Sequence, residues 1–231
     1  MMIPTRPTYH HGDLRNSLIR AALALVAERG VEGFSLREAA RTVGVSASAC
    51  YRHFSDREEL LAAVAHEGLD TLAEEMRAAA TAHEGSSPFD AVNRFWDYGG
   101  AYLGFALAHP AHFRVMHAIP KSEHSRHLML PRTPAILAQA AMDALVDVGA
   151  VAPEAAGRAL LAIWTSVHGL AQLAVGGQLP LDDALTLEAA LDAVLRTAML
   201  GAGVEPALLP PEHPLPGGVC PGMAALVNDV L

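Results

Sequence analysis

Two short helices separated by a glycine turn are the feature that most constrains how this chain can fold. Ser35 and Glu38 have the spacing of a capping box, in which each side chain satisfies a backbone amide of the first helical turn. Gly44 ends that helix early, and Ser46 is placed to cap another helix that reaches about Phe54. A short helix, a tight turn and a second short helix form the pattern of a helix-turn-helix.

Longer helices flank this pair on both sides. Apolar residues recur at helical spacing over residues 13–29, and Gly30 is suited to the C-terminal cap. Ser55 and Glu58 form a second capping-box pattern, which predicts a long helix over 56–82. The inward faces of the two short helices share the apolar side chains Leu36, Ala39, Ala40, Val43, Val45, Cys50 and Phe54.

The remainder of the chain is a series of apolar helices punctuated by proline and glycine. The expected helices cover residues 88–108, 110–117, 135–148, 153–175 and 182–200, with a proline-containing loop at 118–134. Six prolines after residue 200 predict a tail that is extended or partly disordered, with helix-compatible sequence at 223–231. We therefore expect a helix-turn-helix domain at 1–57, a second helical domain at 58–200 and a tail at 201–231.

The composition favours helices over strands and a folded chain over a disordered one. Hydrophobic residues make up 52% of the chain and charged residues 18%, and alanine and leucine dominate over β-branched and aromatic residues. No apolar run reaches the roughly 18 residues of a spanning helix, and the first residues lack the apolar core of a signal peptide. Cys50 and Cys220 cannot build a disulfide framework. We expect an all-α cytoplasmic protein without a membrane segment.

The charge is distributed unevenly along the chain. Residues 1–57 contain eight arginines and five acidic residues, a net charge of +3. The whole chain has a net charge of −9, so the remaining residues carry −12. This asymmetry indicates that only the N-terminal segment faces a polyanion.

Several stretches, all in the correct order, resemble the DNA-binding domain of TetR-family repressors. They are YHHGDLR at 9–15, residues 22–30, FSLREAA at 34–40, VGVS at 43–46 and YRHFSDREELL at 51–61. The resemblance covers roughly residues 9–65. It implies a three-helix DNA-binding domain, a helical ligand-binding and dimerisation domain behind it, and the function of a ligand-responsive repressor. This chain departs from the family at three positions: the family often has a polar residue where this chain has Ala49, leucine where it has Cys50 and lysine where it has Arg57.

The C-terminal part resembles one subgroup of the same family. WTSVHGL at 164–170 is similar to its Trp-His-Gly motif, and the stretch 109–116 is similar to it too. The resemblance implies that helices near 153–175 and 182–200 form a four-helix bundle with the partner subunit of a homodimer. The implied partners are double-stranded operator DNA, a small-molecule effector and the second subunit, and no cofactor is implied.

Recognition of DNA needs cations and hydroxyls on phosphates as well as side chains that reach base edges. Arg37 is the main candidate for base reading, because a guanidinium bonds guanine at two points for about 1–3 kcal/mol of discrimination. The resemblance places Tyr51 and His53 on phosphates, while Ala47 and Ala49 offer only methyl groups. The alternative is that the arginines are solvated and Tyr51 belongs to the core. The predicted DNA-binding residues are Ser35, Arg37, Arg41, Ser46, Ala47, Ser48, Ala49, Tyr51, Arg52, His53 and Arg57.

Aromatic and histidine side chains gather between residues 95 and 117. A small-molecule site requires an apolar cavity with a few polar anchors, and the resemblance implies that these helices line one. The alternative is ordinary core packing, with the histidine of the Trp-His-Gly motif at the dimer seam. The predicted ligand-binding residues are Trp96, Tyr98, Tyr102, Phe105, His109, Phe113, Met116, His117, Trp164 and His168.

Other functions have less support in the sequence. We predict no metal site, because a sensor would have to use His109, His112, His117, His124 and His127 with only Glu123 as a nearby carboxylate in the loop. Cys50 follows the inward pattern, which predicts a buried thiol without a redox role. The sequence contains no nucleophile elbow, phosphate loop, HExxH or paired-carboxylate motif, so we predict no enzyme. A helical small-molecule-binding enzyme and an interaction module without DNA binding remain the alternatives.

Overall fold

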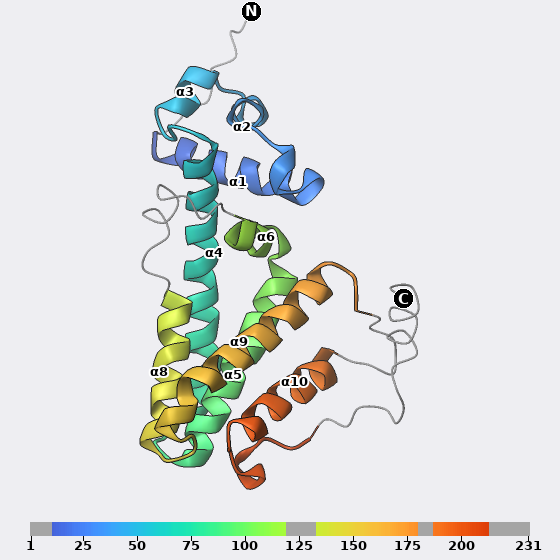
Figure 1. Cartoon of the computed structure of the whole chain (residues 1–231). Helices are drawn as coiled ribbons and strands as arrows, with labels where there is room; N and C mark the ends of the chain where they lie inside the picture. Colours follow the sequence, from blue (N-terminus) through green and yellow to red (C-terminus); the bar gives the residue numbers. More distant parts are fainter. Residues whose placement is uncertain (1–10, 119–132, 180–186, 213–231) are drawn as a thin grey trace, which may run out of the picture. The chain divides into compact units, whose positions relative to one another are not determined.

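The computed structural model describes residues 11–118, 133–179 and 187–212. Every regular element in these ranges is helical, which confirms the predicted all-α class. The chain falls into two compact units (Figure 1). Of the described residues, unit 1 comprises 11–70 and 109–118, and unit 2 comprises 71–108, 133–179 and 187–212.

Unit 1 contains the predicted pair of short helices. Its elements are α1 (His11–Arg29), the 3-10 turn η1 (Val31–Gly33), α2 (Leu36–Val43), α3 (Ala47–Tyr51), the first part of α4 (Arg57–Ala79) and α6 (Pro110–Ala118). Helix α2 packs against both α1 and α3, and α6 packs against α1. α3 ends at Tyr51, earlier than the predicted end near Phe54.

The capping residues at the start of α2 and α3 are those predicted. The Glu38 amide donates to Ser35 Oγ at 3.3 Å, and the Ser35 amide donates to Glu38 Oε2 at 3.0 Å. Gly44 closes α2 with a φ of 77°, a left-handed conformation that glycine adopts without strain. Ser46 Oγ accepts the Ala49 amide at 3.2 Å and so caps α3.

The cap of α4 lies one residue later than predicted. Asp56 Oδ1 accepts the Glu59 amide at 2.8 Å, and Glu59 Oε2 accepts the Ser55 amide at 2.6 Å. The expected pairing of Ser55 with Glu58 is therefore replaced by a pairing that uses Asp56 and Glu59. Both patterns satisfy first-turn amides, so local spacing alone does not distinguish them.

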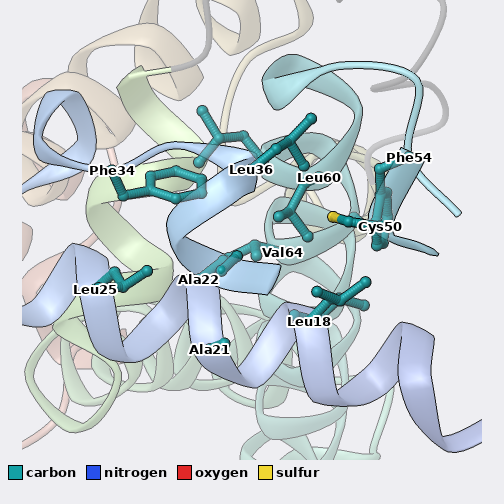
Figure 2. Packing of buried hydrophobic residues seen from close by; sticks show 14 of the residues in the cluster. Leu18, Ala21, Ala22, Leu25, Phe34, Leu36, Cys50, Phe54, Leu60 and Val64 are labelled. Carbon is teal, nitrogen blue, oxygen red and sulfur yellow. The ribbon is translucent and has the colours of Figure 1, made fainter. Parts of the chain in front are cut away.

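A single apolar cluster fills unit 1 (Figure 2). Leu18 from α1, Leu60 from α4 and Phe54 from the segment between α3 and α4 are at most 1% exposed. Burial of such a side chain contributes about 1.5–3 kcal/mol. Cys50 lies beside Phe54 in the cluster, and burial raises the pKa of its thiol. The thiol is thus buried, as predicted.

Helix α6 belongs to this cluster although it lies far along the chain. Val115 is fully buried in the cluster, and Ala111 and Met116 pack against it. A Cβ added at Gly68 of α4 would lie 2.9 Å from Met116 Sδ and 3.0 Å from His112 Cβ, so α4 and α6 approach closely at this glycine. Unit 1 thus continues past residue 57 along α4 and includes α6, and the boundary between residues 57 and 58 stays a prediction.

Unit 2 is built around α5. Its elements are the end of α4, η2 (Ala80–His83), α5 (Pro88–Ala108), α8 (Thr133–Asp147), α9 (Pro153–Val175), α10 (Leu187–Gly201) and η3 (Pro206–Leu208). Helix α5 packs against α8, α9 and α10, and α9 packs along α10. Val92, Met142, Leu145, Leu195 and Met199 are fully buried between them.

The first residues after α10 fold back onto unit 2. Val204 and Leu209 are 2% and 7% exposed. The buried Asn93 amide donates to the Phe89 carbonyl at 2.8 Å and to the Leu208 carbonyl at 3.2 Å. Residues 201–212 are therefore packed, which departs from the predicted tail. Residues 213–231, most of the predicted loop at 118–134 and the start of the helix predicted at 182 lie outside the described residues.

Candidate nucleic-acid interface and effector region

Helix α2 separates its apolar and basic side chains onto different faces. Leu36, Ala39 and Ala40 are buried, whereas Arg37 and Arg41 are exposed one turn apart. The buried face holds α2 against α1 and α3 and leaves both guanidinium groups accessible. This places two of the predicted DNA-binding residues on one accessible side of the helix.

Helix α3 and the two residues that follow it expose a second group of predicted residues. Ser48, Tyr51 and Arg52 are exposed, with Tyr51 at 48%, and His53 is partly exposed. Ser48 Oγ lies 3.0 Å from Ser46 Oγ, so its hydroxyl is held by the cap. Ala47 is partly exposed.

Ala49 differs from the other predicted contacts on α3. It is 8% exposed and belongs to the apolar cluster. Its methyl group therefore packs inward in this structure.

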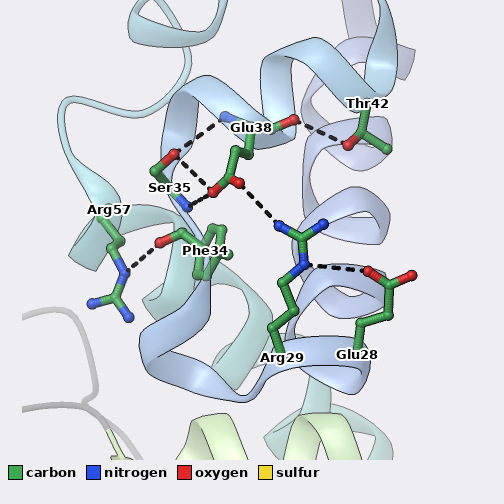
Figure 3. A network of polar contacts seen from close by, with 7 residues as sticks. All are labelled: Glu28, Arg29, Phe34, Ser35, Glu38, Thr42 and Arg57. Carbon is green, nitrogen blue, oxygen red and sulfur yellow. Dashed lines mark hydrogen bonds and ion pairs between the residues drawn. The ribbon is translucent and has the colours of Figure 1, made fainter.

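Glu38 connects the start of α2 to the end of α1 (Figure 3). Its carboxylate accepts from Ser35 and pairs with Arg29 at 3.0 Å, and its backbone carbonyl accepts the Thr42 hydroxyl at 3.0 Å. Arg29 also lies 3.5 Å from Glu28. The Ser35 hydroxyl, followed by the Arg29 charge, lowers the pKa of Glu38. The carboxylate thus remains ionised and holds α2 in position at neutral pH.

Arg57 occupies a position that the sequence did not indicate. It is one of the predicted DNA-binding residues, and its guanidinium turns toward the loop between α1 and α2. Nε donates to the Phe34 carbonyl at 3.2 Å, and a terminal nitrogen donates to the Val31 carbonyl. The pattern SDRE gives only a helix start, and nothing in it reveals a bond to residues more than twenty positions earlier.

In unit 2 the structure brings three predicted effector residues together. The Tyr102 hydroxyl lies 2.8 Å from His168 Nδ1, and the Trp164 and His168 rings stack at 5.4 Å with an interplanar angle of 5°. Burial raises the pKa of Tyr102 and lowers the pKa of His168. Near neutral pH this is a hydrogen bond between two uncharged groups, beside an indole that is 52% exposed.

The other predicted effector residues are spread over both units. In unit 2, Phe105 is fully buried, Tyr98 is partly buried, and Trp96 packs under the Arg196 guanidinium at 5.6 Å. In unit 1, Phe113 is fully buried and its carbonyl lies 3.0 Å from His117 Nδ1. The remaining two are Met116, partly buried against α4, and His109, whose ring lies 5.9 Å from the His112 ring.

A cavity between α9 and α10 was not predicted from the sequence. Its volume is about 590 Å³, and alanines together with Gly201 form most of its wall, with Arg158, Ser166 and Thr197 as polar members. None of the predicted effector residues lines it. Small residues on an apolar helix also fit ordinary packing, so the sequence carried no separate signal for a groove.

Neither a metal site nor a membrane span is found in the part of the chain that the structure describes. No group of three or more histidine, cysteine, aspartate or glutamate side chains there could hold a metal ion. His124 and His127 lie outside the described residues. No helix in the same ranges is long and apolar enough to cross a membrane.

Two family models match consecutive parts of the chain. The model described as "Bacterial regulatory proteins, tetR family" matches residues 18–64, and the model "Tetracyclin repressor-like, C-terminal domain" matches residues 95–198. A curated relative, the HTH-type transcriptional repressor AcnR of Corynebacterium diphtheriae, is 40% identical over 60 residues. That match covers 26% of this chain and 32% of AcnR, so the chain spans about a third of this relative's length.

Solved structures match over most of the chain. A protein of unknown function from Rhodococcus sp. RHA1 is 32% identical to this chain, with a TM-score of 0.68. The match covers 85% of this chain and 99% of the Rhodococcus chain. RolR in complex with resorcinol is 19% identical with a TM-score of 0.59, covering 89% and 97%. At that identity the likeness to RolR concerns the fold.

Proposed function

Because the chain belongs to the TetR family of DNA-binding transcriptional regulators, we propose that it is a homodimeric repressor released from a palindromic operator by a small apolar or aromatic molecule. Family membership makes it a regulator and not an enzyme. TetR regulators bind operator DNA and small-molecule effectors. A cytoplasmic location, with access to the chromosome, belongs to the same proposal.

The exposed face of α2 and α3 is the observation that carries this proposal. Arg37 and Arg41 on α2, Ser48 and Tyr51 on α3, and Arg52 directly after α3 are all exposed, whereas the other faces of both helices are buried in one cluster. Capped, rigidly packed helices position side chains for base edges, and flanking cations and hydroxyls contact phosphates. We assign base reading to Arg37, and phosphate contacts to Tyr51 and Arg52.

We assign dimerisation to α9 and α10. These helices expose the large apolar side chains Leu161, Leu173 and Leu200 at 42–60%. The groove of small residues between them has room for side chains of a second copy. We propose that a second copy of this chain occupies the groove. A dimer has two helix-turn-helix units, which can bind the two half-sites of a palindromic operator about 34–36 Å apart.

We assign effector binding to unit 2. Tyr102 and His168 supply polar atoms beside the Trp164 ring, the combination of aromatic surface and a few polar anchors that small molecules require. The fold relative RolR binds resorcinol, a small aromatic molecule. Trp164, His168 and Gly169 also support assignment to the Trp-His-Gly subgroup.

The connection between α5 and α6 supports a route for the effector signal. Helix α5 ends at Ala108 in unit 2, α6 begins at Pro110, and α6 packs into the core of unit 1. His109 alone separates them. A molecule that displaces the end of α5 therefore acts directly on a helix in the DNA-binding unit. Coupling of this kind typically amounts to about 1–3 kcal/mol.

Fluorescence anisotropy on the purified protein tests the proposal. The probes are the DNA upstream of its own gene, a scrambled duplex and a site selected from a random library, each at two salt concentrations. We expect tight, salt-sensitive binding to the upstream or selected site. Light scattering on the same sample reports whether the bound species is a dimer.

Arg37→Ala is the informative variant, and Arg20→Ala on the exposed side of α1 is its matched control. Arg37→Ala should lose sequence preference and keep weak binding to all duplexes, whereas Arg20→Ala should behave as wild type. If no sequence can be selected from the library by wild-type protein, the proposed function is wrong.

A further inference from the structure

Arg57 links the start of α4 to the loop that precedes α2 (Figure 3). Its Nε donates to the Phe34 carbonyl at 3.2 Å, and its terminal nitrogen donates to the Val31 carbonyl. The guanidinium lies over the Phe34 ring with its carbon 5.3 Å from the centroid. A terminal nitrogen also lies 3.7 Å from the Glu32 carboxylate. One side chain thus contacts three residues of the loop.

These contacts lie directly beside the first turn of α2. Phe34 precedes Ser35, the residue that caps α2, and its ring is 4% exposed in the core of unit 1. Arg37 follows two residues later. On the other side, Arg29 from α1 pairs with Glu38. The first turn of α2 is therefore held by one arginine from α1 and, through the loop, by another from α4.

The geometry of Arg57 is unlike that of a phosphate contact. Its side chain is only 31% exposed, whereas Arg37, Arg41 and Arg52 are exposed. The planar guanidinium bonds two carbonyls and stacks on a ring at the same time. A lysine ammonium is a single point charge and cannot reproduce that combination. The chemistry here requires the guanidinium plane as well as the charge.

We propose that Arg57 is a positioning residue for DNA recognition, which joins the first turn of α4 to the Val31–Phe34 loop and thereby fixes how α2 presents Arg37. This inference rests on the proposed function. A displacement at the start of α4 is passed by Arg57 to the residue before the α2 cap. Arg57 itself contacts no base and no phosphate.

The test compares Arg57→Lys and Arg57→Gln with Arg52→Lys and Arg52→Gln. Arg52 is an exposed arginine five positions away, to which we assign a phosphate contact. Affinities for the selected site and the scrambled duplex are measured over a series of salt concentrations, below the melting temperature of each variant. Hydrogen exchange is measured without DNA for the amides of Glu38 and Ala39, which bond the hydroxyl and the carbonyl of Ser35. Arg57→Lys carries the test if Arg57→Gln fails to fold.

A positioning role and a phosphate contact predict opposite results. If Arg57 is a positioning residue, Arg57→Lys lowers the preference for the selected site over the scrambled duplex about tenfold and leaves the salt slope unchanged. A tenfold loss lies within the range that one bidentate base contact contributes to discrimination. The amides of Arg57→Lys at residues 38 and 39 exchange faster. Arg52→Lys should behave nearly as wild type. Arg52→Gln should weaken binding to both duplexes equally and reduce the salt slope by about 0.9 for each phosphate that is no longer neutralised.

Four results would overturn the proposal. If Arg57→Lys binds DNA as the wild-type protein does, and Arg57→Gln has a reduced salt slope, then Arg57 is a phosphate contact. A lower melting temperature with unchanged preference and unchanged exchange would make it a stabilising residue only. If wild-type protein binds no sequence selectively, the proposed function fails. Unchanged exchange at residues 38 and 39 in Arg57→Lys would separately reject the link to α2.

Discussion

Arg196→Met is expected to destabilise unit 2 by about 3 kcal/mol, because it leaves the buried Asp192 carboxylate without its partner. The two side chains form hydrogen bonds of 3.1 and 3.0 Å, and the Asp192 side chain is 4% exposed. Removal of one member of a buried pair costs about 3–5 kcal/mol. We take the low end because the Arg196 side chain is 18% exposed, so water screens part of the carboxylate's charge.

The same substitution removes two further interactions of Arg196. Its guanidinium donates to the Pro210 carbonyl at 2.8 Å and lies 5.6 Å from the centre of the Trp96 ring. These interactions tie the segment after α10 to the helices of unit 2. In a chain of this size about 1 kcal/mol corresponds to roughly 2–4 °C, so we expect the melting temperature to fall by about 6–12 °C.

Urea unfolding followed by circular dichroism measures the effect. All variants are compared at one protein concentration, because association of subunits would shift the midpoint. Arg77→Met, which removes an exposed arginine from α4, is the control and should change stability by no more than about 0.5 kcal/mol. Arg196→Met combined with Asp192→Leu should regain about 2 kcal/mol, because no charge is then left buried. The reasoning is refuted if Arg196→Met costs less than about 1 kcal/mol, or if the double variant is less stable than the single one.

Three other changes have defined outcomes. Gly44→Ala should cost about 1–2 kcal/mol in urea unfolding, because the left-handed φ of 77° strains any side chain; an unchanged midpoint would contradict this. Burial lowers the pKa of His112 in the folded protein, so the unfolded state binds a proton more readily. The contribution of His112 to the free energy of unfolding is therefore fully present above pH 6.5 and declines as the pH falls. The melting temperature should therefore drop less between pH 7.5 and 5 in His112→Gln than in wild type, and equal drops would exclude His112 as the cause. Ala162→Arg fills the groove between α9 and α10 and should yield monomers by light scattering, whereas an intact dimer would place the interface elsewhere.

Signals that act over a few residues allowed the helices of unit 1 to be predicted. Ser35 with Glu38, Gly44 and Ser46 each satisfy or terminate a backbone turn formed by their own neighbours, so their identities fix the local structure. The cap of α4 shows the limit of this reasoning. Ser55 and Asp56 are both good caps, and the choice of Asp56 depends on the exact position at which the chain enters the helix.

Features that depend on distant residues were not predictable. Arg57 matches a motif position at which the family often has lysine, and only the folded loop shows the two carbonyls that it bonds. Ala49 follows the period of an exposed helix face, yet α3 is so short that its orientation is set by packing against α2. The placement of α6 in unit 1 likewise depends on residues brought together from separate parts of the chain.

The insertion of α6 into the core of unit 1 limits how the DNA-binding segment of such a regulator can be joined to the sensor of another protein. Val115 is fully buried among side chains from α1 and α4, although residues 71–108 of unit 2 separate it from them in sequence. A hybrid protein made by joining residues 1–70 to a foreign sensor would lack this side chain and contain a cavity in its place. Recombination at a single point is therefore unfavourable unless the incoming sensor supplies its own helix to fill that space.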